Sequence, residues 1–279
     1  MTRRHFIRWL LQAGSSGWPI RHAHDHVQGL DVDERWFWIS AVDRRTRTGW
    51  VWRVDRRTLA TAAERDITQG SLYHPGGLQV VGSSLWIPIA EYRPRSSARL
   101  LELDAMTLGE RRSFPVPDHI GAVATDGKTH LVGANWDARQ FYRWDLAGKH
   151  LERVDNRSRL EIQDMKWIAG NLYAGGVEGK ACRVEMLDPT TLAVGRTWTP
   201  GTDQCYTREG MALWGDSFYF LPEDEPHSRI YVSPAGSFER PKSVNHPLGR
   251  FAGAGCRLQP PGSPEGVLYL HSKIVLASV

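Results

Sequence analysis

The sequence predicts an all-β fold, a six-bladed β-propeller, with five blades as the alternative. Three observations predict it. A polar turn pattern recurs along the chain, a short apolar strand pattern recurs every 42 to 48 residues, and no segment has the apolar periodicity of an amphipathic helix. Repeats of roughly 40–50 residues with about four short strands each are typical of propeller blades.

The recurring turns each follow one short apolar strand and precede the next. Their Asp, Pro and Gly residues supply turn geometry and local side-chain capping. The pattern occurs at VDRRTL (54–59), LDAMTL (103–108), WDLAGK (144–149), LDPTTL (187–192) and VSPAGS (232–237).

The expected first strand of each unit is aligned on one apolar residue. The aligned residues are Leu30, Leu78, Val123, Met165, Met211 and Cys256. The sixth unit is incomplete, so its outer strand is expected from the N-terminus, either at 6–11 or at 18–20. Such closure removes exposed sheet edges. We therefore expect one propeller domain over 21–279.

Residues 1–20 are either this closing strand or a signal remnant, because MTRRHFIRWLLQAG resembles a twin-arginine export signal. A periplasmic and a cytoplasmic location thus both stay open. The three cysteines are odd in number and lack CxxC spacing, which argues against a disulfide framework or a structural zinc site. A Cys182–Cys205 bridge is expected only if the protein is exported.

The charge pattern argues against a nucleic-acid partner. The net charge is +4, and 29 of the 35 basic residues are Arg, scattered among 31 acidic residues. Nucleic-acid proteins usually gather their basic residues on one face. No apolar run approaches the roughly 20 residues that span a membrane. We expect a monomer with a small-molecule substrate and no membrane partner.

Histidine recurs at one position of three successive units. Four residues before the aligned apolar position stand His26, His74 and His119, and the later units have Glu161, Thr207 and Ala252. Because the first strand of each blade lines the central channel, the three histidines are expected on one ring near the axis. The alternative for any one of them is a structural role, a hydrogen bond to the backbone of a neighbouring blade.

Acidic residues recur where the following strand ends, at Asp43, Glu91, Asp137, Glu178 and Asp224. In propellers the loop before the first strand and the loop after the second open on the same face. Glu91 and Arg93 are therefore expected beside His74, and Gly76-Gly77 would let the backbone approach the axis. Acids at strand ends also serve as turn caps, which is the alternative.

Neutral imidazoles with nearby carboxylates suit a divalent ion such as Mn, Zn or Ca. The expected ligands are His26, His74 and His119, with Glu91 or Glu161 as a fourth. We hypothesise a metal-dependent lyase or hydrolase acting on a small anionic carbohydrate or lactone in the channel. The alternative is a non-catalytic propeller that binds a partner. Metal content of the purified protein separates the two.

Four further residues would complete the chemistry. Tyr92 or Glu209 would serve as general base. Arg93 or Arg208 would orient an anionic group by bidentate contact. Trp136, on a funnel loop, is a candidate to stack a sugar ring.

The stretch HPGGLQV…LWIPIAEYRP…DHIGAVATD, concentrated in residues 74–145, resembles an uncharacterised bacterial family of β-propellers. The architecture is also similar to gluconolactonase-type six-bladed propellers, which implies a divalent metal in the channel. The histidine-rich mouth is similar to that of propeller lyases, which implies a His-bound metal beside a substrate carboxylate. Fold similarity alone does not establish an activity.

Overall fold

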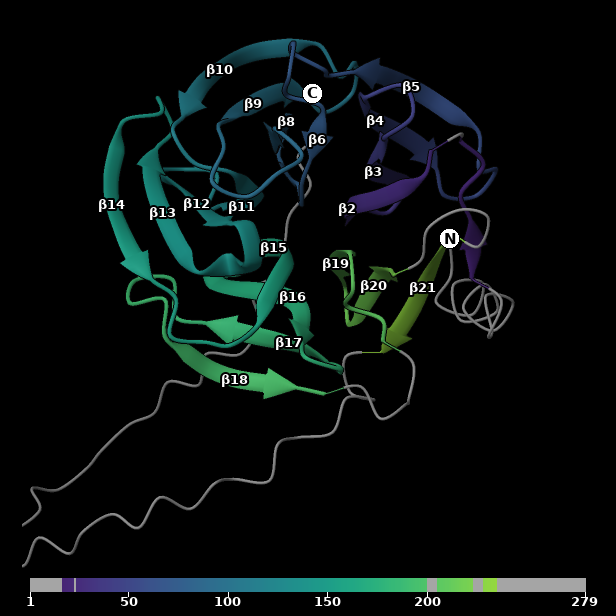
Figure 1. The fold of residues 1–279 in the computed structure, drawn as a ribbon. Helices are drawn as coiled ribbons and strands as arrows, with labels where there is room; N and C mark the ends of the chain where they lie inside the picture. Colours follow the sequence, from purple (N-terminus) through teal and green to yellow (C-terminus); the bar gives the residue numbers. More distant parts are fainter. Residues whose placement is uncertain (1–16, 23, 200–204, 223–227, 235–279) are drawn as a thin grey trace, which may run out of the picture. The chain divides into compact units, whose positions relative to one another are not determined.

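The computed structural model describes residues 17–22, 24–199, 205–222 and 228–234, all within one compact unit. Among these residues the fold is five antiparallel sheets and one short 3-10 turn, η1 (Trp136–Ala138) (Figure 1). The all-β propeller prediction is confirmed. No helix of the described part is long and apolar enough to cross a membrane.

Each of the five described blades has an inner strand and three strands outside it; in blade 2, the inner position is shared by two short strands that pair with the same neighbour. Blade 1 comprises β2 (His26–Val32), β3 (Trp36–Asp43), β4 (Thr48–Asp55) and β5 (Thr61–Asp66). Blade 2 comprises β6 (His74–Pro75), β7 (Gln79–Val81), β8 (Ser84–Ala90), β9 (Ala98–Asp104) and β10 (Glu110–Val116). Blade 3 comprises β11 (Ile120–Thr125), β12 (His130–Asn135), β13 (Gln140–Asp145) and β14 (His150–Asp155).

Blade 4 comprises β15 (Glu161–Ile168), β16 (Asn171–Glu178), β17 (Ala181–Leu187) and β18 (Val194–Trp198). Blade 5 comprises β19 (Gly210–Trp214), β20 (Ser217–Leu221), β21 (Arg229–Pro234) and, from the start of the chain, β1 (Trp18–Pro19).

In the part of the chain that the structure describes, the ring closes with five blades, so the prediction of six is wrong and the alternative of five is right. β1 supplies the fourth strand of blade 5, pairing Trp18 with Ile230. The inner strands β19 and β2 lie side by side, since a Cβ on Gly210 would meet Leu30 at 2.9 Å. The N-terminal closing strand was predicted, but it completes the fifth blade. The expected sixth unit falls at 252–279, outside the described residues.

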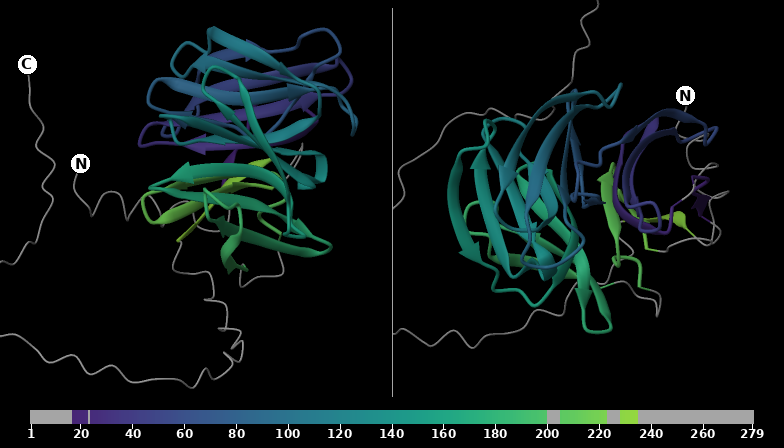
Figure 2. Two further views of the ribbon diagram at one scale, coloured as in Figure 1. Left: turned by 90° about the vertical axis from the view of Figure 1, so that its left-hand side faces the viewer. Right: turned by 45° about the horizontal axis from the view of Figure 1, so that its top comes forward.

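Five apolar layers hold the ring together, one between each pair of neighbouring blades. The layer between blades 5 and 1 includes Phe37, Trp52 and Tyr219, all nearly inaccessible to solvent. Between blades 1 and 2, the Trp38 indole also donates a hydrogen bond of 2.7 Å to the carbonyl of Ala105. Tryptophans of blade 1 therefore pack against both neighbouring blades. Figure 2 shows the blades from two further directions.

Three of the recurring turns share one hydrogen-bonding geometry. In VDRRTL, Oδ1 of Asp55 accepts from the backbone N–H of Arg57 and Thr58 and from the Thr58 hydroxyl. Leu59 closes the turn with φ of 59° and donates its N–H to the Asp55 carbonyl. The turns at Asp104 and Asp188 repeat these bonds. The repeated sequence is thus a repeated structure.

The HPGG stretch brings the backbone of blade 2 against that of blade 3. Gly77 donates its N–H to the carbonyl of Gly121 and accepts from Val123. A Cβ on Gly76 would overlap the Gly121 carbonyl, and one on Gly77 would stand 2.5 Å from Oδ1 of Asp164. The prediction that these glycines permit a close backbone approach is confirmed.

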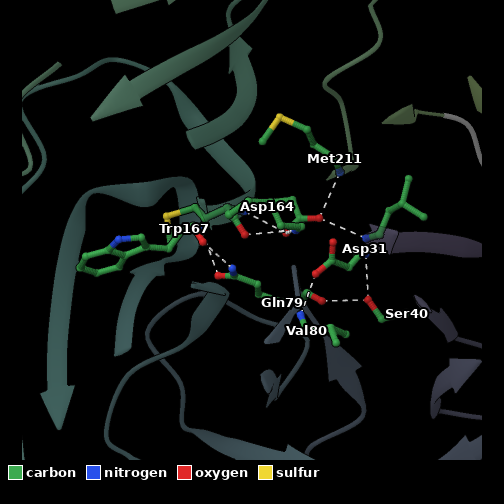
Figure 3. A network of polar contacts seen from close by, with 12 residues as sticks. Asp31, Ser40, Gln79, Val80, Asp164, Trp167 and Met211 are labelled. Atoms are coloured by element: carbon green, nitrogen blue, oxygen red, sulfur yellow. Dashed lines mark hydrogen bonds and ion pairs between the residues drawn. The ribbon is translucent and has the colours of Figure 1, made fainter. Parts of the chain in front are cut away.

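A buried polar network joins the inner strands around the axis (Figure 3). Oδ2 of Asp164, on blade 4, accepts from the backbone N–H of Leu30 and Met211, which belong to blades 1 and 5. Its Oδ1 accepts from the Lys166 ammonium at 2.5 Å. Asp31 accepts from the N–H of Val80 on blade 2. Carboxylates near the axis therefore satisfy amides of neighbouring blades.

Cys182 on β17 and Cys205 form a disulfide with Cα atoms 5.2 Å apart. The bridge fastens the segment before β19 to blade 4. The sequence led us to expect this disulfide only if the protein is exported.

Candidate functional site

Three histidines gather where the inner strands of blades 1 to 3 begin. His26 opens β2, His74 opens β6, and His119 directly precedes β11. The ring centres of His26 and His74 are 6.3 Å apart, and those of His74 and His119 are 5.4 Å apart. The structure therefore brings together the three residues that the repeat register aligned. We call this cluster the histidine site.

His74 lies at the centre of the histidine site and has no polar partner among the described residues. Its side chain is buried, and neither Nδ1 nor Nε2 has a hydrogen bond. Burial, helped by the charges of His119 and His26, holds the pKa of His74 well below its usual value. The ring is therefore neutral at pH 7, with one lone pair available.

His119 is oriented by the AEYRP loop. Its Nδ1 is 3.1 Å from the carbonyl oxygen of Arg93 and 3.4 Å from the hydroxyl of Ser96. Since a carbonyl only accepts, Nδ1 carries the proton and Nε2 is left as the acceptor. Burial lowers the pKa of His119 too. This ring is also a neutral imidazole.

Aromatic rings enclose the histidines. The Tyr92 ring lies 4.2 Å from that of His74, edge to face, and the Trp136 indole lies 4.6 Å from the ring of His119. Tyr73 stands behind Tyr92, at 6.1 Å. The rings exclude water from His74 and leave an aromatic border on the site.

An ion pair holds the Tyr92 hydroxyl. Nε of Arg44 is 2.8 Å from Oδ2 of Asp25, and the same guanidinium hydrogen-bonds the Tyr92 hydroxyl. Burial raises the pKa of Tyr92, Arg44 opposes the shift, and the nearby Glu209 carboxylate adds to it. Tyr92 is therefore a protonated phenol at neutral pH. Tyr92 and Glu209 were both predicted as general bases, and of the two Glu209 has the side chain, a carboxylate, that can accept a proton at neutral pH.

Glu91 and Arg93 pair with each other beside the site. Oε2 of Glu91 accepts from Nε of Arg93 at 2.8 Å, and Oε1 accepts from the Ser97 hydroxyl. The Arg93 hydrogen bond lowers the pKa of Glu91. Glu91 would have to leave these partners to ligate a metal. The contribution of Arg93 that the structure shows is its backbone carbonyl.

The later blades place different groups at the histidine position. Glu161 opens β15 with its side chain 41% exposed, and Oε1 lies 3.8 Å from Nη2 of Arg139. Thr207 is buried and donates its hydroxyl to the carbonyl of Gly176. Arg208 is exposed. Thr207 thus hydrogen-bonds the backbone of the neighbouring blade, as the structural alternative held, whereas the ion pair of Glu161 is with Arg139.

Of the strand-end acids, Asp43 caps its own turn, as the alternative held. Oδ1 of Asp43 accepts from the backbone N–H of Arg45 and Thr46. Glu178 pairs with Arg183 on the next strand. Asp224 lies outside the described residues.

Comparison with known proteins identifies the family of this chain. Residues 11–167, more than half of the 279, match a family of unknown function, DUF6454. The chain belongs to the DUF6454 family. No curated protein matches it significantly.

Solved structures similar to this DUF6454 chain show the fold alone. Glutaminyl cyclase of Myxococcus xanthus has a TM-score of 0.57 and 16% identity, covering 77% of this chain and 93% of that one. A protein of unknown function from Bacteroides caccae has a TM-score of 0.52 and 7% identity, covering 77% and 80%. The resemblance to an uncharacterised family is thus supported. The similarity to six-bladed gluconolactonase-type propellers is not.

Sequence reasoning missed Arg44 and Asp25 of the DUF6454 chain. Asp25 immediately precedes His26, and Arg44 immediately follows Asp43 at the end of the neighbouring strand. The hairpin β2–β3 pairs His26 with Val42, so the two flanking residues meet. The available signal was a pair of opposite charges at the open end of a predicted hairpin: Asp25 just before its first strand and Arg44 just after its second.

Proposed function

We propose that this DUF6454 chain is an enzyme that binds a divalent transition metal through His26, His74 and His119. It would act as a lyase or hydrolase on a small anionic carbohydrate or lactone. The observation that carries the proposal is His74, a buried imidazole with both nitrogens unpartnered. Buried polar atoms without partners are rare in native proteins and point to a missing ion, water or ligand.

The donor set fits such an ion. Neutral imidazoles are its usual ligands, and Nδ1 of His119 is hydrogen-bonded to a carbonyl, as metal-binding histidines commonly are. Two imidazoles on one ion, with metal–nitrogen distances of about 2.0–2.1 Å, have ring centres roughly 5–6 Å apart. The His74–His119 distance of 5.4 Å falls in this range, and the His26–His74 distance of 6.3 Å is slightly longer.

Metal binding therefore requires His26 to move toward His74. Within the described residues, no three His, Cys, Asp or Glu side chains already stand in metal-binding geometry. Glu91 and Glu161 remain proposed fourth ligands only if their Arg partners release them.

The surrounding groups suit acid–base chemistry on an anionic substrate. A bound ion would supply a Lewis acid for a substrate oxygen. Glu209 would take a proton from substrate or water, and the Tyr92 phenol would donate one to the departing oxygen. Arg44, which hydrogen-bonds the Tyr92 hydroxyl, would orient a substrate anion together with Arg93 or Arg208.

The first test is metal content by mass spectrometry on tag-free protein purified without chelator. About one equivalent of a transition metal is expected in the wild type, with loss in His74→Ala. His150→Ala is the matched control, because His150 lies exposed on the outer strand β14. Full metal occupancy in a variant with His26, His74 and His119 all changed to alanine would show that the proposed metal site is wrong.

A thermal-shift experiment separates the enzyme from a non-catalytic binding propeller. An ion that binds only the native state stabilises it by about 2.7 kcal/mol at a hundredfold excess over Kd. No bound metal, and no shift with manganese, zinc or calcium, would favour the binding propeller. Glutaminyl cyclisation is assayed beside lactone and uronate turnover because of the shared fold with the Myxococcus enzyme.

A further inference from the structure

The turn after β12 holds two neighbouring non-glycine residues in the left-handed region. Asp137 has φ of 57° and Ala138 has φ of 51°. Each such residue costs on the order of 1–3 kcal/mol and persists only where its surroundings enforce it. Contacts with residues outside the turn are therefore needed to hold this backbone conformation.

Side-chain amides on both sides of the turn enforce it. Oδ1 of Asn135 accepts from the N–H of Gln140 at 2.8 Å. Nδ2 of Asn156 donates to the carbonyl of Ala138 at 2.8 Å, and the Asn156 N–H donates to the Arg139 carbonyl. These bonds close the turn around Trp136–Ala138.

The enforced turn directs Trp136 to the histidine site. Its indole contacts the rings of His119, His74 and Tyr92 at 4.6, 6.0 and 6.4 Å, with interplanar angles of 78°, 41° and 64°. Among the described residues, none of the rings that contact Trp136 lies parallel to it, and its side chain is only partly buried. The Trp136 side chain is therefore partly accessible to solvent at the border of the histidine site.

We propose that Trp136 is the stacking platform for the sugar ring of the substrate, and that it sets specificity for uronates. This inference rests on the proposed function and names its substrate class. A pyranose has an apolar C–H face for an indole and polar edges that need donors and acceptors. Arg139, on the same turn, has a side chain that is 62% exposed and forms long ion pairs with Asp137 at 3.6 Å and with Glu161 at 3.8 Å. A substrate carboxylate would replace one of these partners on the guanidinium.

The experiment measures D-glucuronate binding by isothermal titration calorimetry, with D-glucose as the uncharged comparison. The wild type should bind glucuronate more tightly than glucose. Trp136→Ala should lose about tenfold or more in affinity, and Trp136→Phe should lose less because it keeps an aromatic face. Trp214→Phe is the matched control, since Trp214 ends β19, away from the mouth.

Glucuronate affinity, metal content and melting temperature are measured for each variant, so that the possible outcomes can be told apart. Trp136→Phe should keep the metal and a melting temperature near that of the wild type, whereas His74→Ala should lose the metal. Equal glucuronate affinity in wild type and Trp136→Ala overturns the platform, and so does a wild type that binds neither sugar. Glucuronate binding that depends on Trp136 in a protein without metal would uphold the platform while the metal proposal fails. If Trp136→Ala does not fold, Trp136→Phe and Arg139→Gln carry the comparison.

Discussion

At the scale of single residues, Asp31 makes folding depend on pH. Its carboxyl is buried near the axis, and burial raises its pKa from 3.8 to about 6, although Lys166 and two backbone amides oppose the shift. Between these two pKa values the folded state binds more protons than the unfolded state. The stabilising contribution is therefore complete below about pH 4 and is lost as pH rises to about 6.

We predict that the free energy of unfolding of the wild type, relative to Asp31→Asn, falls by on the order of 2–3 kcal/mol from pH 4 to pH 7. Asparagine cannot ionise, so the other titrating groups cancel in the difference. Denaturant unfolding at several pH values measures it. A difference that stays flat with pH would show that the Asp31 pKa is not raised.

At the scale of strands and turns, the glycines of HPGG differ from the glycine that faces them. A Cβ on Gly76 would overlap the Gly121 carbonyl, whereas the nearest atom to a Cβ on Gly121 would be 3.9 Å away. Gly76→Ala should cost about 3 kcal/mol or more, because backbone has to shift. Gly121→Ala should change stability by no more than about 0.5 kcal/mol. Thermal unfolding of the two variants gives the comparison, and equal melting temperatures would contradict it.

The sequence predicted elements whose signals are local. Asp55, Asp104 and Asp188 each mark a turn because the carboxylate caps amides two and three residues ahead. The aligned histidines follow from the same repeat. The η1 turn could not be predicted, because its left-handed backbone is imposed by Asn156 from the next loop. The pairing of Arg44 with Asp25 likewise depends on strand register rather than on neighbouring residues.

At the scale of the whole molecule, the number of blades could not be predicted correctly from the sequence. Repeat counting gave six units, since the apolar pattern around Cys256 resembles an inner strand. Closure instead depends on how β19 packs against β2 and on which strand covers the last blade. Both are long-range contacts, and no local pattern encodes them.

The closing strand gives the last prediction. Trp18 packs against Phe37 at 5.6 Å and Tyr219 at 6.1 Å, and β1 covers the edge of β21. A truncation that removes residues 1–20 should melt roughly 5 °C or more below one that removes 1–16 and keeps β1, because it loses a packed Trp and one strand pairing. It should also associate as concentration rises, since an uncovered edge pairs with other chains. Calorimetry and light scattering compare the two. Equal melting temperatures and equal masses would mean that the ring does not depend on β1 for closure.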